Sequence, residues 1–199
     1  MKLSKPTSIQ LFKRSIFALI TIGSFVLLQS FSMVTEDVKI KSSVINWLGT
    51  KVTGSHEGTV NLQSGFLKFE NNDLVGGEFV IDMTSIACTD LSGKGKASIE
   101  KHLMSDDFFS VDAFPSASLK ILDVKKNGLD DYLVTANITI KDITQAITFK
   151  TTVKDDEAKA TLIIDRTEFG IIYKSGNFFE ELADKAIYDE FEMTINLKF

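Results

Sequence analysis

Arginine and histidine are scarce in this chain, and they are the residues best suited to bind or polarise a ligand. Arg166 is the only arginine after residue 33, and it lies at a predicted strand end beside Asp165 and Glu168. Its guanidinium could form two parallel hydrogen bonds with a phosphate or carbonyl head group. A strand-end arginine flanked by acids also suits a structural ion pair with Asp165, Glu168 or another carboxylate. We favour the structural interpretation.

The two histidines, His56 and His102, could bind a metal ion only with a third protein ligand such as Glu57 or Asp106. No HExxH-like spacing is present to support this. A hydrogen bond to a polar head group, for which His56 is the candidate, and ordinary packing are the other interpretations. We therefore expect no metal site.

No pattern typical of covalent catalysis or nucleotide binding is found. No serine lies in a Gly-x-Ser-x-Gly context, and Cys88 is the only cysteine, which excludes an internal disulfide. We expect Cys88 to pack as a small hydrophobe or to lie idle near a loop. The glycine-lysine run 93–96 lacks Walker spacing and predicts a flexible linker. We expect no catalytic residues, no enzyme activity and no cofactor.

Residues 1–33 have the features of a secretory signal peptide: basic residues, the apolar run 15–28, and small residues at Ser30 and Ser32. A retained anchor is the alternative, but the run is shorter than the roughly 18 residues of a spanning helix. Cleavage would leave one domain, residues 34–199, in the periplasm or secreted, with no stable membrane insertion. This domain has 18 basic and 27 acidic residues, a charge of −9 that repels nucleic acid.

Alternating apolar and polar residues predict an all-β fold. The predicted strands are 38–51, 59–69, 74–83, 117–122, 132–140, 143–153, 159–165 and 191–199. Residues 54–58 are predicted to form a turn, Gly65 a bulge or bend, and Asn127-Gly128 a hairpin. An eight-stranded antiparallel barrel is favoured over a sandwich, because pairing the first and last strands would remove both exposed edges.

The segment His102–Pro115 interrupts this pattern with a short helix and aromatic bulk. Ile99, His102 and Leu103 would share one helix face. Three phenylalanines follow in irregular chain, at positions 108, 109 and 114, and such a surface must be covered. We interpret this segment as a helical lid over the open end of the barrel.

An apolar barrel interior could hold one long-chain lipid, although sequence alone does not separate a hollow lumen from a filled one. About 0.8 kcal/mol per buried CH₂ makes ten such groups worth ~8 kcal/mol, near micromolar affinity. The predicted ligand-binding residues in the barrel are Trp47, Phe79, Ile81, Leu119, Val134, Ile138, Ile147, Phe149, Phe191, Met193 and Ile195, with Phe108 and Phe109 at the lid. His56 and Arg166 are the head-group candidates.

Five short motifs in order make the chain resemble the YceI-like family of bacterial lipid-binding proteins. They are Trp47-x-Gly49-x-Lys51, Gly54-Ser55-His56-x-Gly58, Gly76-Gly77-x-Phe79-x-Ile81-Asp82-Met83-x-Ser85-Ile86, His102-Leu103-x-Ser105-x-Asp107-Phe108-Phe109 with Phe114-Pro115, and Asp165-Arg166-x-x-Phe169-Gly170-Ile171. The resemblance implies a lipocalin-like barrel, often periplasmic, that encloses a polyisoprenoid or similar amphiphile, and it implies that homodimers occur. Lys141-Asp142 departs from the lysine-glycine turn common in the family.

These observations lead to one leading hypothesis and two alternatives. The leading one is non-enzymatic binding, storage or transport of a long-chain isoprenoid lipid of the polyprenyl phosphate or quinone type. The alternatives are an enzyme acting on a lipid head group in the same cavity, and a secreted stress-related structural protein with a filled core. The volume of the barrel interior separates the last from the other two.

Overall fold

The computed structural model describes residues 34–199, and the expected signal peptide therefore lies outside the described residues. Nine strands, one α-helix and two short 3-10 helices follow one another in this part of the chain. In order they are β1 Thr35–Lys39, β2 Ser42–Lys51, β3 Gly54–Glu70, β4 Asp73–Cys88, α1 Gly93–Met104, β5 Ser116–Lys126, β6 Asp131–Ile140, β7 Ile143–Lys154, β8 Glu157–Asp165, η1 Arg166–Phe169, η2 Ala183–Lys185 and β9 Ile187–Lys198.

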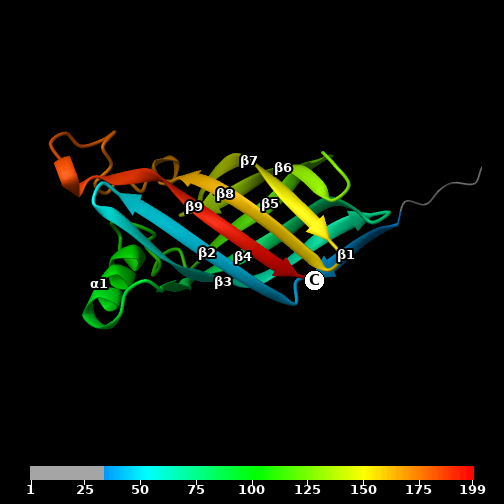
Figure 1. Cartoon of the computed structure of the whole chain (residues 1–199), viewed down its shortest axis with the longest axis horizontal. Helices are drawn as coiled ribbons and strands as arrows, with labels where there is room; N and C mark the ends of the chain where they lie inside the picture. Colours follow the sequence, from blue (N-terminus) through cyan, green and yellow to red (C-terminus); the bar gives the residue numbers. More distant parts are fainter. Residues whose placement is uncertain (1–33) are drawn as a thin grey trace, which may run out of the picture. The chain divides into compact units, whose positions relative to one another are not determined.

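The strands form a closed antiparallel barrel, as the sequence predicts. Eight strands, β2 to β9, each pair with their neighbours, and β2 pairs with β9 from Ser42↔Lys198 to Lys51↔Ile187. β3 pairs with both β2 and β4, so the ring has no free edge along these ladders. β1 is an extra strand beside the C-terminal part of β3. Figure 1 shows α1 and the chain between η1 and η2 at one end of the barrel and the C-terminus at the other.

The turn predicted for residues 54–58 is wrong. The chain reverses at Val52-Thr53, and Gly54 already begins β3. Gly58 lies opposite Trp47 in the β2–β3 ladder, where a Cβ would stand 1.9 Å from the Ala87 carbonyl oxygen and 2.5 Å from the indole ring. Glycine is required there because the backbone of β4 and the aromatic ring both approach it closely. A Cβ at Gly65 would likewise stand 2.5 Å from the Phe79 ring. The bulge or bend predicted at this glycine corresponds to a register shift just before it, between Leu62 and Ser64.

One seam of the barrel is paired over part of its length only. β7 and β8 pair from Thr151↔Ala160 to Lys154↔Glu157, so the first half of β7 has no strand partner on that side. The 3-10 helix η1 approaches this half, where the Gln145 amide donates to the Glu168 carbonyl at 3.2 Å. Phe169, 1% exposed, belongs to the hydrophobic core beside it. Side chains therefore complete the barrel wall where the backbone ladder stops.

The helix at the barrel end is longer than expected. α1 spans twelve residues and begins at Gly93, so the interpretation of residues 93–96 as a flexible linker is wrong. Lys96 donates to the Cys88 carbonyl, and its ammonium lies 2.7 Å from Glu100, one turn further along. Glu100 in turn accepts from the Cys88 backbone N–H at 2.9 Å. These contacts fix the first half of α1 to the end of β4, which a periodicity analysis of α1 alone does not reveal.

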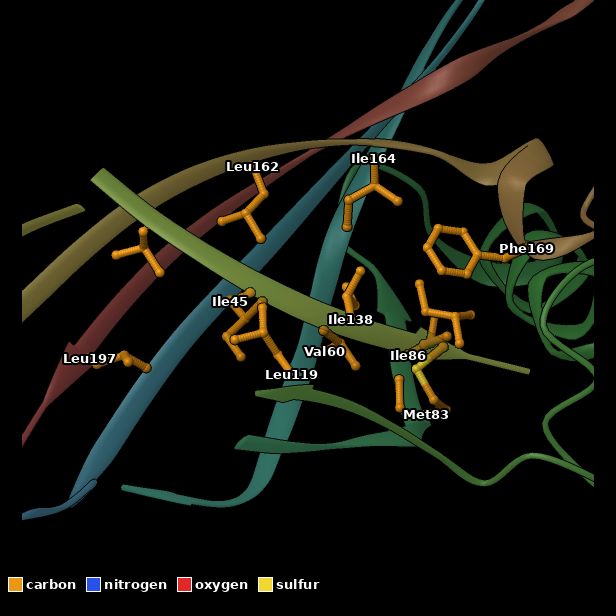
Figure 2. Close-up of a cluster of buried hydrophobic side chains, with 14 of the residues drawn as sticks. Ile45, Val60, Met83, Ile86, Leu119, Ile138, Leu162, Ile164, Phe169 and Leu197 are labelled. Carbon is orange, nitrogen blue, oxygen red and sulfur yellow. The ribbon is translucent and has the colours of Figure 1, made fainter. Parts of the chain in front are cut away.

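The core consists of the inward-facing residues of the strands. Buried aliphatic side chains from opposite walls point toward one another across the barrel, as Figure 2 shows for Ile45, Leu119, Ile138 and Leu162. At the end opposite α1, the rings of Phe69 and Phe199 pack with centroids 5.3 Å apart. The barrel interior is therefore apolar along its length.

Candidate functional site

The interior of the barrel is hollow. It encloses a cavity of about 210 Å³ whose wall is made by inward-facing side chains of all eight barrel strands together with the lid. Ligand pockets usually measure about 300–1,000 Å³, so this cavity is small for a ligand pocket. The filled core that one alternative requires is not present.

Several large inward-facing side chains are only half-buried because they border the cavity. Trp47, Phe79, Phe149, Phe191 and Met193 all have this intermediate exposure, although each lies on the inner face of its strand. Val134 also borders the cavity, but it is completely buried by its neighbours. The inner wall therefore presents aromatic and thioether surface to whatever enters the barrel.

The segment Ser105–Phe114 closes one end of the cavity with aromatic contacts. Phe108 and Phe109 both line the cavity, and the ring of Phe109 meets that of Phe191 edge to face at 6.4 Å. The hydrogen bonds of this segment stay within it and with the last turn of α1, for example from Phe109 N–H to Leu103 O at 3.1 Å and from Val111 N–H to Met104 O at 2.9 Å. This part of the lid, Ser105–Phe114, is thus a compact unit that contacts the opposite wall through side-chain packing.

The predicted ligand-binding residues lie around the cavity with one exception. The twelve that border it are Trp47, Phe79, Ile81, Phe108, Phe109, Leu119, Val134, Ile138, Phe149, Phe191, Met193 and Ile195. Ile147 does not border it. It is a partly buried residue on the half of β7 that lacks a β8 partner, where the wall departs from a regular barrel. Ile147 follows the predicted alternation, but it lies where β7 has no β8 partner and does not border the cavity.

The alternation did not single out several residues that also line the cavity. Ala158 and Ala160 on β8 are small, and Gly49 on β2 has no side chain, so hydrophobic bulk does not mark them. A Cβ at Gly49 would meet no atom within 4 Å, which shows open space in front of it. The sequence signal for all three is their place in the same alternation as their apolar neighbours.

Arg166 is a structural residue. It is 3% exposed, and its guanidinium donates to the carbonyls of Tyr188, Ile171 and Ile187 at 2.7–3.2 Å and to Asp189 Oδ1 at 3.0 Å. Burial lowers the pKa of Arg166, and Asp189 opposes that effect. The favoured interpretation of a structural ion pair is supported, with Asp189 as the partner rather than Asp165 or Glu168. Four of its five N–H donors are already used, which leaves little capacity for a ligand head group.

His56 lies outside the cavity wall, in a cluster that joins β3 to the chain before α1. Its Nδ1 is 2.8 Å from Asp90 Oδ2, and Asp90 Oδ1 accepts from the Glu57 N–H and from the Cys88 thiol. The thiol and His56 lower the pKa of Asp90. Burial, followed by the hydrogen bond to Asp90, raises the pKa of Cys88. Cys88 is therefore held as a neutral thiol, which is not the reactive form.

His102, the first residue of the lid segment, packs between two aromatic rings. Its ring lies edge to face on Tyr173 at 4.5 Å and on Phe108 at 5.0 Å. Its Nε2 is buried and has no hydrogen-bond partner within residues 34–199. The side chain does not border the cavity, so its role is aromatic packing between the lid and the chain after η1.

Within residues 34–199, no group of three or more His, Cys, Asp or Glu side chains is placed to hold a metal ion. No helix within this range has the length and apolar character needed to cross a bilayer.

Solved structures with the same fold include two at low sequence identity. BcnA of Burkholderia cenocepacia is 18% identical, covers 78% of this chain and 94% of its own, and gives a TM-score of 0.59. A polyisoprenoid binding domain from Saccharophagus degradans, implicated in plant cell wall breakdown, is 12% identical. It covers 83% of this chain and 97% of its own, with a TM-score of 0.54. At these identities the similarity shows the fold alone.

Sequence comparison gives a short match and a long one. A UPF0312 protein of Yersinia pestis is 39% identical over 51 residues, 26% of this chain and 26% of that protein, so the chain spans about a quarter of the length of the curated relatives it matches. The family profile described as YceI-like domain matches residues 35–199, from the first strand of the structure to its last residue. With the barrel, the lid and the apolar cavity on the same residues, this match shows that the chain belongs to the YceI-like family.

Proposed function

We propose that this protein binds a long-chain isoprenoid lipid in the barrel cavity and stores or transports it without chemical change. The observation that supports the proposal most strongly is an interior that is both hollow and apolar, closed by phenylalanines. Each CH₂ buried there contributes about 0.8 kcal/mol, so binding needs few polar contacts. The Saccharophagus degradans protein, which has the same fold, is described as a polyisoprenoid binding domain.

The charged residues at the cavity do not select between a quinone and a polyprenyl phosphate head group. They are Lys159, Arg166 and Glu190. Lys159 and Glu190 are exposed and alternate with the inward-facing residues of β8 and β9, and Arg166 pairs with Asp189 at 3.0 Å. Lys159 and Lys198 both pair with Glu157, which leaves one positive charge there against the negative charge of Glu190.

The only tryptophan of the chain gives a direct test, since Trp47 borders the cavity. Titration with a long-chain quinone should quench its fluorescence with saturation, because a quinone in the cavity would lie near the indole. A polyprenol and the matching polyprenyl phosphate should both displace the quinone, because burial of the chain would supply most of the binding free energy. Absence of saturable quenching contradicts the proposal.

Two variants of β2 make the titration specific to the cavity. Gly49→Phe would place a ring in the open space in front of Gly49 and should weaken binding about tenfold, because it removes volume from the cavity. Val44→Phe, on the exposed face of the same strand, is the matched control and should bind like the unchanged protein. Equal binding by both variants would place the ligand elsewhere.

We further propose that residues 1–33 direct export to the periplasm or the medium, where the mature protein can form a homodimer. N-terminal sequencing of the protein from its host tests the cleavage, and light scattering tests the oligomeric state.

A further inference from the structure

Two adjacent phenylalanines are exposed at the lid end of the barrel. Phe178 is 55% and Phe179 46% exposed, and both lie in the segment between η1 and η2. Figure 1 shows this segment at the same end of the barrel as α1. Single exposed apolar residues are common on soluble proteins, but a pair of aromatic rings side by side is a feature of interaction surfaces.

The backbone beneath the two rings is held in a fixed turn. The N–H groups of Phe178 and Phe179 both donate to the carbonyl of Ser175, at 3.2 and 3.0 Å. Ser175 is completely buried, and its hydroxyl donates to Asp189 Oδ2 at 2.8 Å. The Asn177 amide donates to the same oxygen at 2.8 Å. A hydrogen-bonded turn therefore fixes the backbone that carries the two exposed rings.

This turn is connected to the lid through the buried ion pair. The second oxygen of Asp189 pairs with Arg166, whose guanidinium lies 5.7 Å from the centre of the Phe108 ring. Tyr173, two residues before Ser175, also contacts Phe108, with ring centroids 6.0 Å apart. The exposed rings and the cavity-closing ring of the lid thus belong to one continuous set of contacts.

We propose that Phe178 and Phe179 dock the lid end of the barrel on an uncharged or zwitterionic lipid surface. This rests on the proposed function, because a lipid tail moves between a bilayer and the cavity without crossing water only if the cavity end meets the bilayer. Phenylalanine is among the apolar side chains that interfacial proteins bury at the boundary between head groups and acyl chains. The flanking charges, Glu180, Glu181 and Asp184 against Lys174 and Lys185, exclude an anionic surface, since they add no net positive charge.

The test is flotation of the mature protein with phosphatidylcholine vesicles. The double variant Phe178→Ser, Phe179→Ser should bind about tenfold more weakly, because it removes both rings that would enter the interface. The matched control is Leu122→Ser, Leu129→Ser, which removes two exposed apolar side chains of the β5–β6 hairpin, at the other end of the barrel. The control should bind vesicles like the unchanged protein.

A second readout separates this proposal from the proposed function. Quenching of Trp47 by a medium-chain alkyl quinone added from solution should be the same in the phenylalanine variant and in the unchanged protein, since neither ring borders the cavity. Equal vesicle binding by the phenylalanine variant and the unchanged protein, no binding by either, or stronger binding to phosphatidylglycerol vesicles overturns the docking proposal. Absence of quenching in the unchanged protein overturns the proposed function instead.

Discussion

At the scale of single residues, the charged groups of this protein stabilise the fold around the cavity. Arg166 and Asp189 form a buried pair in which every contact is to the protein itself. Asp90 likewise joins β3, β4 and the chain before α1. The sequence analysis singled out Arg166, His56 and Cys88 but not their carboxylate partners, and the structure shows that both groups position elements.

Removal of the Asp189 charge should destabilise the protein strongly. Asp189→Asn leaves the Arg166 guanidinium buried without a counter-charge, which typically costs about 3 kcal/mol. Urea unfolding at neutral pH measures the difference, and Asp184→Asn, at an exposed position of η2, is the control with little expected effect. A loss below about 1 kcal/mol for Asp189→Asn would contradict the structural role of the pair.

The contribution of Asp90 should disappear in acid. Its pKa in the folded protein is below that of the unfolded chain, so its contribution to stability is complete above about pH 4 and falls as the pH drops below that value. Asp90→Asn should therefore be less stable than the unchanged protein at neutral pH, and the difference should shrink in acid. Unfolding measured from neutral pH down to about pH 3 gives the answer. A difference independent of pH would mean that the charge of Asp90 contributes nothing.

At the scale of elements, the alternation of apolar and polar residues predicted the barrel strands. It did not predict where β3 and α1 begin, because both starts depend on contacts with residues distant in sequence. The register of β9 could be predicted, because Phe191, Met193 and Ile195 alternate with polar residues. The start of β3 could not, because glycine and serine at its beginning look like a turn until Trp47 is placed across from Gly58. The start of α1 was missed for a similar reason, since Lys96 and Glu100 bond to Cys88.

The two glycines near Trp47 should respond differently to a methyl group. Gly58→Ala places a Cβ 1.9 Å from the Ala87 carbonyl oxygen and should cost about 2 kcal/mol, because the backbone must shift. Gly49→Ala meets no atom within 4 Å and should leave stability nearly unchanged. Thermal unfolding of the two variants tests this contrast, and similar melting temperatures would show that the close approach of the Ala87 carbonyl and the indole does not require glycine at position 58.

At the scale of the whole molecule, the hollow interior separates the two hypotheses that use the cavity from that of a filled core, and it could not be predicted from the sequence. Trp47, Phe149 and Phe191 have the same alternation in a filled barrel and in a hollow one. Only their half-buried state around the cavity separates the two. Under the proposed function, burial of an apolar chain would supply most of the binding free energy, which fits an inner wall with few polar groups.

Organic extraction of the mature protein, purified without detergent from its natural host, followed by mass spectrometry tests the central claim most directly. We expect a long-chain isoprenoid lipid at close to one molecule per protein, and clearly less of it on the Gly49→Phe variant, whose added ring occupies cavity space. An extract of the unchanged protein without any long-chain lipid, or equal lipid on both proteins, would contradict binding in the barrel.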